Sequence, residues 1–115
     1  MIDDVRLHDL QLIMKDDFSE LIEIFIEDSI SRSDVLKSLL AESPVDSLAV
    51  KNNAHTLKGS SSNLFATKLQ ELYMSLEQMA GESNLDEVSV LMSQIEKETF
   101  VVFDELKTFN SKLNL

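Results

Sequence analysis

The sequence predicts an all-α fold, namely an antiparallel four-helix bundle with a short additional N-terminal helix. Two glycines and one proline in 115 residues are far fewer than the roughly 14 that average composition gives. All-β folds need a turn after every strand or two, so this shortage argues against them. Apolar side chains also recur every three or four residues over long stretches, which is the spacing of amphipathic helices. Four such helices bury their apolar faces by packing together.

The first two helices have acidic start signals. Asp4 is the candidate N-cap of a short helix that ends near residues 16–17. Asp17 then caps the second helix, and Glu20 follows three residues later in the spacing of a capping box. We expect this second helix to extend to about Ala41.

One face of the second helix is mostly apolar or small, which marks it as the core-facing side. Its members are Phe18, Ile22, Phe25, Ser29, Leu36 and Leu39. Residues 27–34, in the middle of the helix, are polar except for Ile30. This stretch interrupts an otherwise regular amphipathic pattern.

The third helix is expected to begin with Ser43 as N-cap. Pro44 follows in the first helical position, where a missing N–H costs nothing, and Asp46 lies in the first turn, near the positive end of the helix dipole. We expect the helix to end at Ser62 or Asn63. On a helical wheel its small and apolar residues form one narrow core-facing stripe: Val50, Ala54, Leu57, Ser61 and Leu64.

The fourth helix is expected to stop at Gly81, because glycine suits the position just after a helix C-terminus. Its apolar positions are Leu69, Leu72, Leu76 and Met79. Ser83, with Asp86 three residues later, begins the fifth helix. Residues 99–103 have strong strand propensity, but no turn residue flanks them and the helical rhythm continues through them. We therefore assign them to the fifth helix.

Composition limits the class of protein. The net charge of −11, from 10 Lys and Arg against 21 Asp and Glu, disfavours binding to nucleic acid or to a membrane surface. The absence of cysteine excludes disulfides and Cys-ligated metals. The longest uninterrupted apolar run, residues 100–103, is far too short to span a bilayer. We expect one domain over residues 1–115, cytoplasmic and monomeric, without a metal or cofactor.

The largest local departure in composition lies in the third helix and just beyond it. Residues 47–70 contain no Asp or Glu, where an even spread of the 21 acids would place about four. The segment carries Lys51, Lys58 and Lys68 instead. A locally basic face on an acidic protein favours contact with an anionic partner or group.

His55 is expected on the exposed side of the third helix, about 140° from the centre of its apolar stripe. Gly59, one turn later, costs a helix interior about 1 kcal/mol relative to alanine, which indicates that a bulky reactant approaches closely there. Lys58 can bring an ammonium group into the same space. An accessible imidazole, an open position and an adjacent cation describe a nucleophile that receives a negatively charged group.

A phosphoryl group fits this description. An imidazole with the ordinary pKa of about 6.5 is mostly uncharged at neutral pH and has a ring nitrogen that can attack phosphorus. A lysine ammonium offsets charge on the equatorial oxygens of the transferring group. The chain has no glycine-rich phosphate loop to hold ATP. The donor must therefore be another protein.

Residues 54–64, Ala-His-Thr-Leu-Lys-Gly-Ser-Ser-Ser-Asn-Leu, resemble the signature of histidine-containing phosphotransfer (HPt) domains. In that family a run close to His-x-Leu-Lys-Gly-Ser-Ser-x-Asn-Leu-Gly-Ala lies on one helix of a four-helix bundle. The resemblance implies that His55 is the phosphoacceptor, through its Nε2 atom. It also implies that Lys58 stabilises the phosphoryl group and that Gly59 provides steric clearance.

The same resemblance implies a carrier without kinase or phosphatase activity of its own. Family members accept a phosphoryl group from the aspartyl phosphate of a receiver domain, as in a hybrid sensor histidine kinase, and pass it to the aspartate of a response regulator. Any Mg²⁺ is expected in the receiver, because the helix around His55 offers no carboxylate. The candidate docking face consists of residues on the His55 side of the helix: Leu48, Lys51, Asn52 and Ser62.

One position departs from the family pattern. Phe65 stands where the pattern usually has glycine, at the junction of the third and fourth helices. We expect Asn63 to supply the left-handed backbone conformation instead, and Phe65 to join the core.

Two alternatives remain open. The bundle could be a non-catalytic adaptor, or it could be the substrate domain of a histidine kinase, labelled by that kinase's ATP-binding domain. The chain begins at Met1 and ends shortly after its last helix, which favours a free-standing relay protein of the bacterial type. Phosphoryl labelling that depends on His55 separates a carrier from an adaptor.

Overall fold

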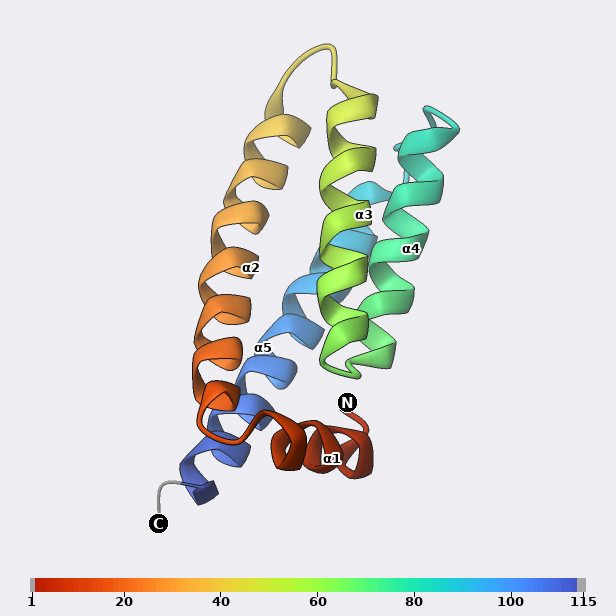
Figure 1. The fold of residues 1–115 in the computed structure, drawn as a ribbon. Helices are drawn as coiled ribbons and strands as arrows, with labels where there is room; N and C mark the ends of the chain where they lie inside the picture. The colour runs from red at the N-terminus through yellow and green to blue at the C-terminus, as the bar shows by residue number, and fades with distance from the viewer. Residues whose placement is uncertain (1, 114–115) are drawn as a thin grey trace.

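The structure is a computed structural model that describes residues 2–113, with side chains for residues 2–111. The described residues form five α-helices and confirm the predicted bundle: α1 (Asp4–Met14), α2 (Asp17–Ala41), α3 (Ser47–Asn63), α4 (Thr67–Gly81) and α5 (Val88–Leu113). Figure 1 shows α2, α3 and α4 side by side, with α5 crossing behind them and α1 lying across one end. The ends of the predicted 1–115 domain, residues 1 and 114–115, lie outside the described residues.

A single apolar core runs through the bundle. Phe18 and Phe25 of α2 pack on Phe109 and Phe103 of α5, with ring centroids 5.8 Å and 6.2 Å apart. The core also takes in the fully buried residues Ile22, Leu36, Leu69, Tyr73, Leu76, Val102 and Leu106. Burial of each large side chain stabilises the fold by about 1.5–3 kcal/mol. The core therefore holds α2, α4 and α5 in fixed positions around α3.

The predicted inner stripe of α3 is confirmed. Its five members, Val50, Ala54, Leu57, Ser61 and Leu64, are each at most 1% exposed. The Ser61 hydroxyl donates to the Leu57 carbonyl at 2.8 Å, so its burial leaves no polar atom unsatisfied. The small residues Ala54 and Ser61 allow α3 to pack closely on α4, its main neighbour. This packing fixes which face of α3 is left to solvent.

Two helix starts were predicted one residue too late. Asp3, not Asp4, caps α1, since its carboxylate accepts from the Arg6 amide at 3.2 Å. Asp17 is the first residue of α2, and Asp16 precedes it without a side-chain cap. The expected capping box at the start of α2 is therefore wrong, because residue 16 stays in the αR conformation and the chain passes from one helix to the next almost without a break.

The start of α3, in contrast, was predicted too early. Ser43 and Pro44 lie in the loop before the helix, and Asp46 is the actual N-cap. The Asp46 carboxylate accepts from the Ala49 amide at 3.1 Å. A carboxylate at this position satisfies an orphan N–H and also faces the positive end of the helix dipole. The predicted end at Asn63 is confirmed.

The turn between α4 and α5 is longer than predicted. Gly81 is the last residue of α4 rather than the residue after it, and Ser83 adopts the left-handed conformation with φ 53°. The Asn84 amide donates to the Met79 carbonyl at 2.9 Å, which closes the end of α4. Helix α5 consequently begins at Val88 and not at Ser83. Residues 99–103 are helical, as predicted.

Phe65 itself takes the left-handed conformation at the junction of α3 and α4, with φ 59°. The expectation that Asn63 would supply it is wrong, because Asn63 remains the last residue of α3. The Phe65 ring packs on the core, and the Arg6 guanidinium carbon lies over the ring, 6.0 Å from the ring centroid. The Phe65 carbonyl oxygen accepts a hydrogen bond from the Asp3 amide at 3.1 Å. A non-glycine residue in this conformation costs about 1–3 kcal/mol, and these contacts with α1 offset part of that cost.

No helix within residues 2–113 has both the length and the apolar content needed to cross a bilayer.

Candidate functional site

His55 lies in the middle of α3 and faces solvent. Its side chain is 70% exposed, whereas Ala54 and Leu57 beside it are buried. The predicted exposure of the imidazole is therefore confirmed. The position is rigid despite its exposure, because the opposite side of the same helix is anchored in the core.

Glu77 of α4 joins His55 and Lys58 into one cluster. One carboxylate oxygen, Oε2, lies 2.6 Å from His55 Nδ1, and the other, Oε1, accepts from Lys58 Nζ at 2.9 Å. The Glu77 side chain is 19% exposed and that of Lys58 is 23% exposed. The carboxylate thus lies at the edge of the α3–α4 contact and bridges two residues that are one turn apart on α3.

The charge of Glu77 fixes the tautomer of His55. The hydrogen bond from Lys58 is the main cause of a lowered pKa of Glu77. Partial burial acts to raise this pKa, and the hydrogen bond with His55 acts to lower it further. The carboxylate is therefore ionised at neutral pH and can only accept hydrogen bonds. Nδ1 must carry the proton that it shares with Glu77, which leaves the lone pair of a neutral imidazole on Nε2. Nε2 is the ring nitrogen that Glu77 does not contact.

Gly59 leaves the surface beside His55 open. A Cβ atom built at this position meets nothing within 4 Å, and Gly59 has a negative φ. Neither internal packing nor backbone conformation therefore requires glycine here. The space above Gly59 is open to a molecule approaching from outside, which is the geometry that the predicted role of Gly59 requires.

The other predicted surface residues are less closely tied to His55. Leu48 is 66% exposed on the same helix face, and Asn52 is exposed as well. Ser62 is half-buried. Lys51 leans toward α4, so that a Cβ at Gly81 would lie 3.8 Å from Lys51 Cδ and Cε. Its ammonium group therefore lies near the C-terminus of α4, where a helix dipole favours positive charge.

The sequence reasoning missed Glu77. The absence of acids from residues 47–70 is real, but the site is not free of acids, because α4 supplies a carboxylate from outside that segment. A helical wheel describes one helix and does not show which face of a neighbour lies beside it. The sequence held only a weak signal for Glu77. This residue directly follows the core position Leu76 and therefore lies at the margin of the buried stripe of its helix.

No group of three or more His, Cys, Asp or Glu side chains that could hold a metal ion occurs within the described part of the chain. The Glu77 carboxylate already interacts with a lysine and a histidine. The site therefore brings together an oriented imidazole and a neighbouring ammonium group.

Comparison with known proteins gives a consistent result. A model of the Hpt domain family matches residues 20–107. The fold is similar to that of histidine-containing phosphotransfer protein B (HptB) from Pseudomonas aeruginosa PAO1, with a TM-score of 0.90 and 32% sequence identity over 96% of this chain and 95% of that one. The maize histidine-containing phosphotransfer protein ZmHP2 has the same fold, with a TM-score of 0.85 and 23% identity over 96% and 89% of the two chains. No curated protein sequence matches significantly.

Proposed function

The chain belongs to the Hpt domain family of phosphorelay carriers, and from that premise we propose that His55 is the residue that carries the phosphoryl group. One observation supports this assignment above all others. Glu77 holds Nδ1 of an imidazole that is 70% exposed, so that Nε2 points its lone pair at solvent. An oriented, unprotonated nitrogen is what attack on phosphorus requires.

The proposed reaction transfers phosphoryl from an aspartyl phosphate to nitrogen. The Nε2 lone pair forms the N–P bond as the P–O bond to the donor aspartate breaks, and the electron pair leaves with the aspartate carboxylate. The proton on Nδ1 stays in its hydrogen bond to Glu77, so the ring gains positive charge as the bond forms. The Glu77 carboxylate stabilises that charge without a change in geometry. Transfer to an acceptor aspartate is the same step reversed.

Lys58 has a separate task. Its ammonium group is anchored on Glu77 at 2.9 Å, one turn along α3 from His55. From that position it can offset negative charge on the equatorial oxygens of the transferring phosphoryl group. Lys58 therefore acts on the phosphoryl group, whereas Glu77 acts on the imidazole.

We expect the partners to be receiver domains, with which proteins of this family interact. The donor is proposed to be the receiver of a hybrid sensor histidine kinase and the acceptor that of a response regulator. Each receiver would supply its own aspartate and the Mg²⁺ that it needs. This chain would contribute the carrier site without kinase or phosphatase activity.

The docking surface is proposed to extend from α3 onto α2. A groove of about 170 Å³ lies between these helices, beyond Gly59 toward the end of α3. Its lining includes Ile24, which is 55% exposed. The residues that line it are Leu21, Ile24, Phe25 and Asp28 of α2 and Ser60, Asn63 and Leu64 of α3. Leu48 near the start of α3 and this groove near its end would give the His55 face apolar contacts on both sides of the imidazole.

Two variants are expected to separate binding from transfer. Leu48→Asp places a charge on an exposed apolar anchor and should weaken receiver binding roughly 10-fold, because interface anchors are worth about 1–2 kcal/mol. Lys58→Ala should slow transfer more than it weakens binding, because the ammonium acts on the transferring group. Titration of a receiver by calorimetry and rapid-quench transfer kinetics measure the two effects. Equal binding by Leu48→Asp and wild type would remove Leu48 from the interface.

Gly59→Ala is expected to make the protein more stable and less active. The new methyl group meets no internal atom, and alanine is favoured over glycine in a helix by about 1 kcal/mol. Urea denaturation should therefore show a higher free energy of unfolding. Transfer from a phosphorylated receiver should become slower, because the methyl group occupies space that the partner needs. Unchanged transfer would mean that Gly59 does not provide clearance.

The proposed function is tested by mixing the protein with radiolabelled, phosphorylated receiver domains. A carrier takes up label that is labile in acid and stable in base, as a phosphoramidate is, and passes it to a second receiver. An adaptor binds the receiver but acquires no label. Binding without label from every receiver that binds would overturn the proposal.

A further inference from the structure

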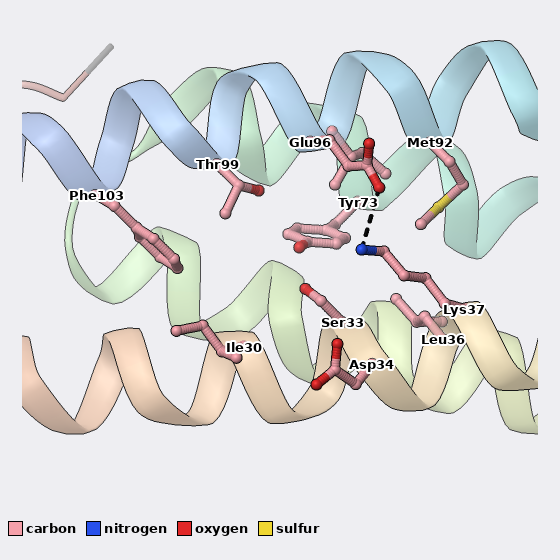
Figure 2. A pocket seen from close by; sticks show the side chains of 11 residues that line it. Ile30, Ser33, Asp34, Leu36, Lys37, Tyr73, Met92, Glu96, Thr99 and Phe103 are labelled. Carbon is pink, nitrogen blue, oxygen red and sulfur yellow. Dashed lines mark ion pairs between the residues drawn. The ribbon is translucent and has the colours of Figure 1, made fainter.

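A second cavity lies away from His55, between α2 and α5. Its volume is about 180 Å³, and Tyr73 of α4 lines it between the two helices (Figure 2). Its lining from α2 and α5 includes the apolar residues Ile30, Leu36, Met92, Ile95 and Phe103 and the charged residues Asp34, Lys37 and Glu96. None of the residues assigned to phosphotransfer lines this cavity.

Three hydroxyl groups meet at one side of the cavity. Figure 2 shows Ser33 of α2 and Thr99 of α5 directed toward the hydroxyl end of Tyr73. Tyr73 is only 1% exposed, and burial raises its pKa although the Thr99 and Ser33 hydroxyls act in the opposite direction. Among the described residues, the Thr99 Oγ1 atom is buried and forms no hydrogen bond of good geometry, although it lies close enough to the Tyr73 hydroxyl to lower the pKa of Tyr73. A buried hydroxyl without a partner carries a desolvation cost that a bound polar group would relieve.

The cavity also accounts for two irregularities in the sequence. Ile30 and Ser33 come from residues 27–34, the polar middle of α2, and Thr99 and Phe103 come from residues 99–103, the strand-like part of α5. Residues 27–34 interrupt the amphipathic pattern of α2, residues 99–103 have strand propensity within α5, and the two segments lie opposite each other across one space. Core packing alone would favour apolar residues there.

A weak ion pair borders the cavity. Lys37 Nζ lies 3.3 Å from Glu96 Oε1, across the gap between α2 and α5 (Figure 2). The two side chains are 57% and 58% exposed. Exposed pairs contribute little to stability, so this pair can move to admit a small molecule without disturbing the bundle.

We propose that this cavity binds a small molecule with one aromatic ring and one hydroxyl group. A cavity of about 150 Å³ is large enough to hold benzene, so the space of about 180 Å³ accommodates a single ring with one substituent. Phe103 and Tyr73, on the Thr99 side of the cavity, offer the edge and face contacts that aromatic rings favour. The ligand hydroxyl pairs with the Thr99 hydroxyl beside Ser33 and Tyr73.

Phenol and toluene are matched probes for this site, because they differ only in a hydroxyl against a methyl group. Titration of the ¹⁵N-labelled full chain with phenol should shift amide signals of residues that line the cavity, with a dissociation constant in the roughly millimolar range expected of so small a ligand. Toluene should bind less tightly. The variant His55→Gln should bind phenol like wild type, so failure of the phosphotransfer assignment leaves this result unaffected.

Thr99→Val and Thr108→Val form a matched pair of variants on α5. The first removes the unpartnered hydroxyl, and the second makes the same chemical change at an exposed position outside the cavity. Thr99→Val should weaken phenol binding about fivefold, the equivalent of one hydrogen bond, and should leave toluene binding unchanged or improved. Thr108→Val should bind phenol like wild type. Shifts scattered over the surface, or equal phenol affinity for both variants, would overturn the proposal.

Discussion

Replacing His55 with glutamine is expected to abolish phosphoryl labelling while leaving the fold intact. Glutamine is similar in size and polar, but its side chain has no lone pair on nitrogen that can attack phosphorus. The His55 side chain is 70% exposed, so its loss creates no cavity, and Glu77 keeps its bond to Lys58. Label uptake from a phosphorylated receiver should fall to background, with an unchanged far-ultraviolet circular dichroism spectrum.

His8→Gln is the matched control for this experiment. His8 is the other histidine of the chain and is also exposed, on α1, so it has the same intrinsic chemistry without Glu77 and Lys58 beside it. This variant should be labelled as fast as wild type. Label retained by His55→Gln and lost from His8→Gln would place the phosphoacceptor on α1 and refute the assignment.

Replacing Glu77 is expected to have the second largest effect. In Glu77→Ala, Nδ1 loses its acceptor and Lys58 loses its anchor, so the tautomer that places the lone pair on Nε2 is no longer fixed. We expect transfer to slow roughly 10- to 100-fold, by analogy with the loss of the carboxylate that orients a metal-ligating histidine. Glu77→Gln retains an acceptor oxygen without the charge and should lose less. Rapid-quench kinetics of label transfer measures both.

Two controls make the Glu77 result specific. Glu71→Gln removes an exposed carboxylate from the same helix and should leave the rate unchanged. Receiver binding by Glu77→Ala should stay near that of wild type, because only 19% of the Glu77 side chain is exposed to a partner. A parallel loss of binding and transfer would contradict an orienting role.

The pH dependence of stability offers an independent check on Glu77. Its pKa is lowered from the ordinary 4.5, mainly by the bond from Lys58. A lowered pKa means that the ionised carboxylate stabilises the fold above pH 4.5, and that this contribution is lost as the pH falls through the lowered value. The difference in unfolding free energy between wild type and Glu77→Gln should shrink over that interval in urea denaturation. A difference that stays constant across it would show that the carboxylate charge does not matter.

The helical fold and the exposure of His55 could be predicted because both depend on periodicity within one helix. The stripe from Val50 to Leu64 sets the orientation of α3, and every residue on the opposite side follows from it. Residues 99–103 were assigned correctly for the same reason, since a buried helical rhythm overrides local strand propensity.

Contacts between helices could not be read in this way. Glu77 was missed because its importance depends on how α4 is rotated against α3, which the core packing of both helices decides together. Phe65 shows the same limit: its left-handed conformation depends on α1, whose Asp3 amide and Arg6 side chain hold it from a distant part of the sequence. Helix starts were predicted at the wrong residue where several possible capping residues lie close together, as at Ser43 and Asp46.

The account rests on one atom, His55 Nε2, and nuclear magnetic resonance can identify it. The protein would be ¹⁵N-labelled at histidine and phosphorylated by a receiver domain, and the coupling between ³¹P and the ring nitrogens would be measured. We predict coupling to Nε2 of His55, with Nδ1 still protonated and bonded to Glu77. Coupling to Nδ1, or to no histidine nitrogen at all, would contradict the account.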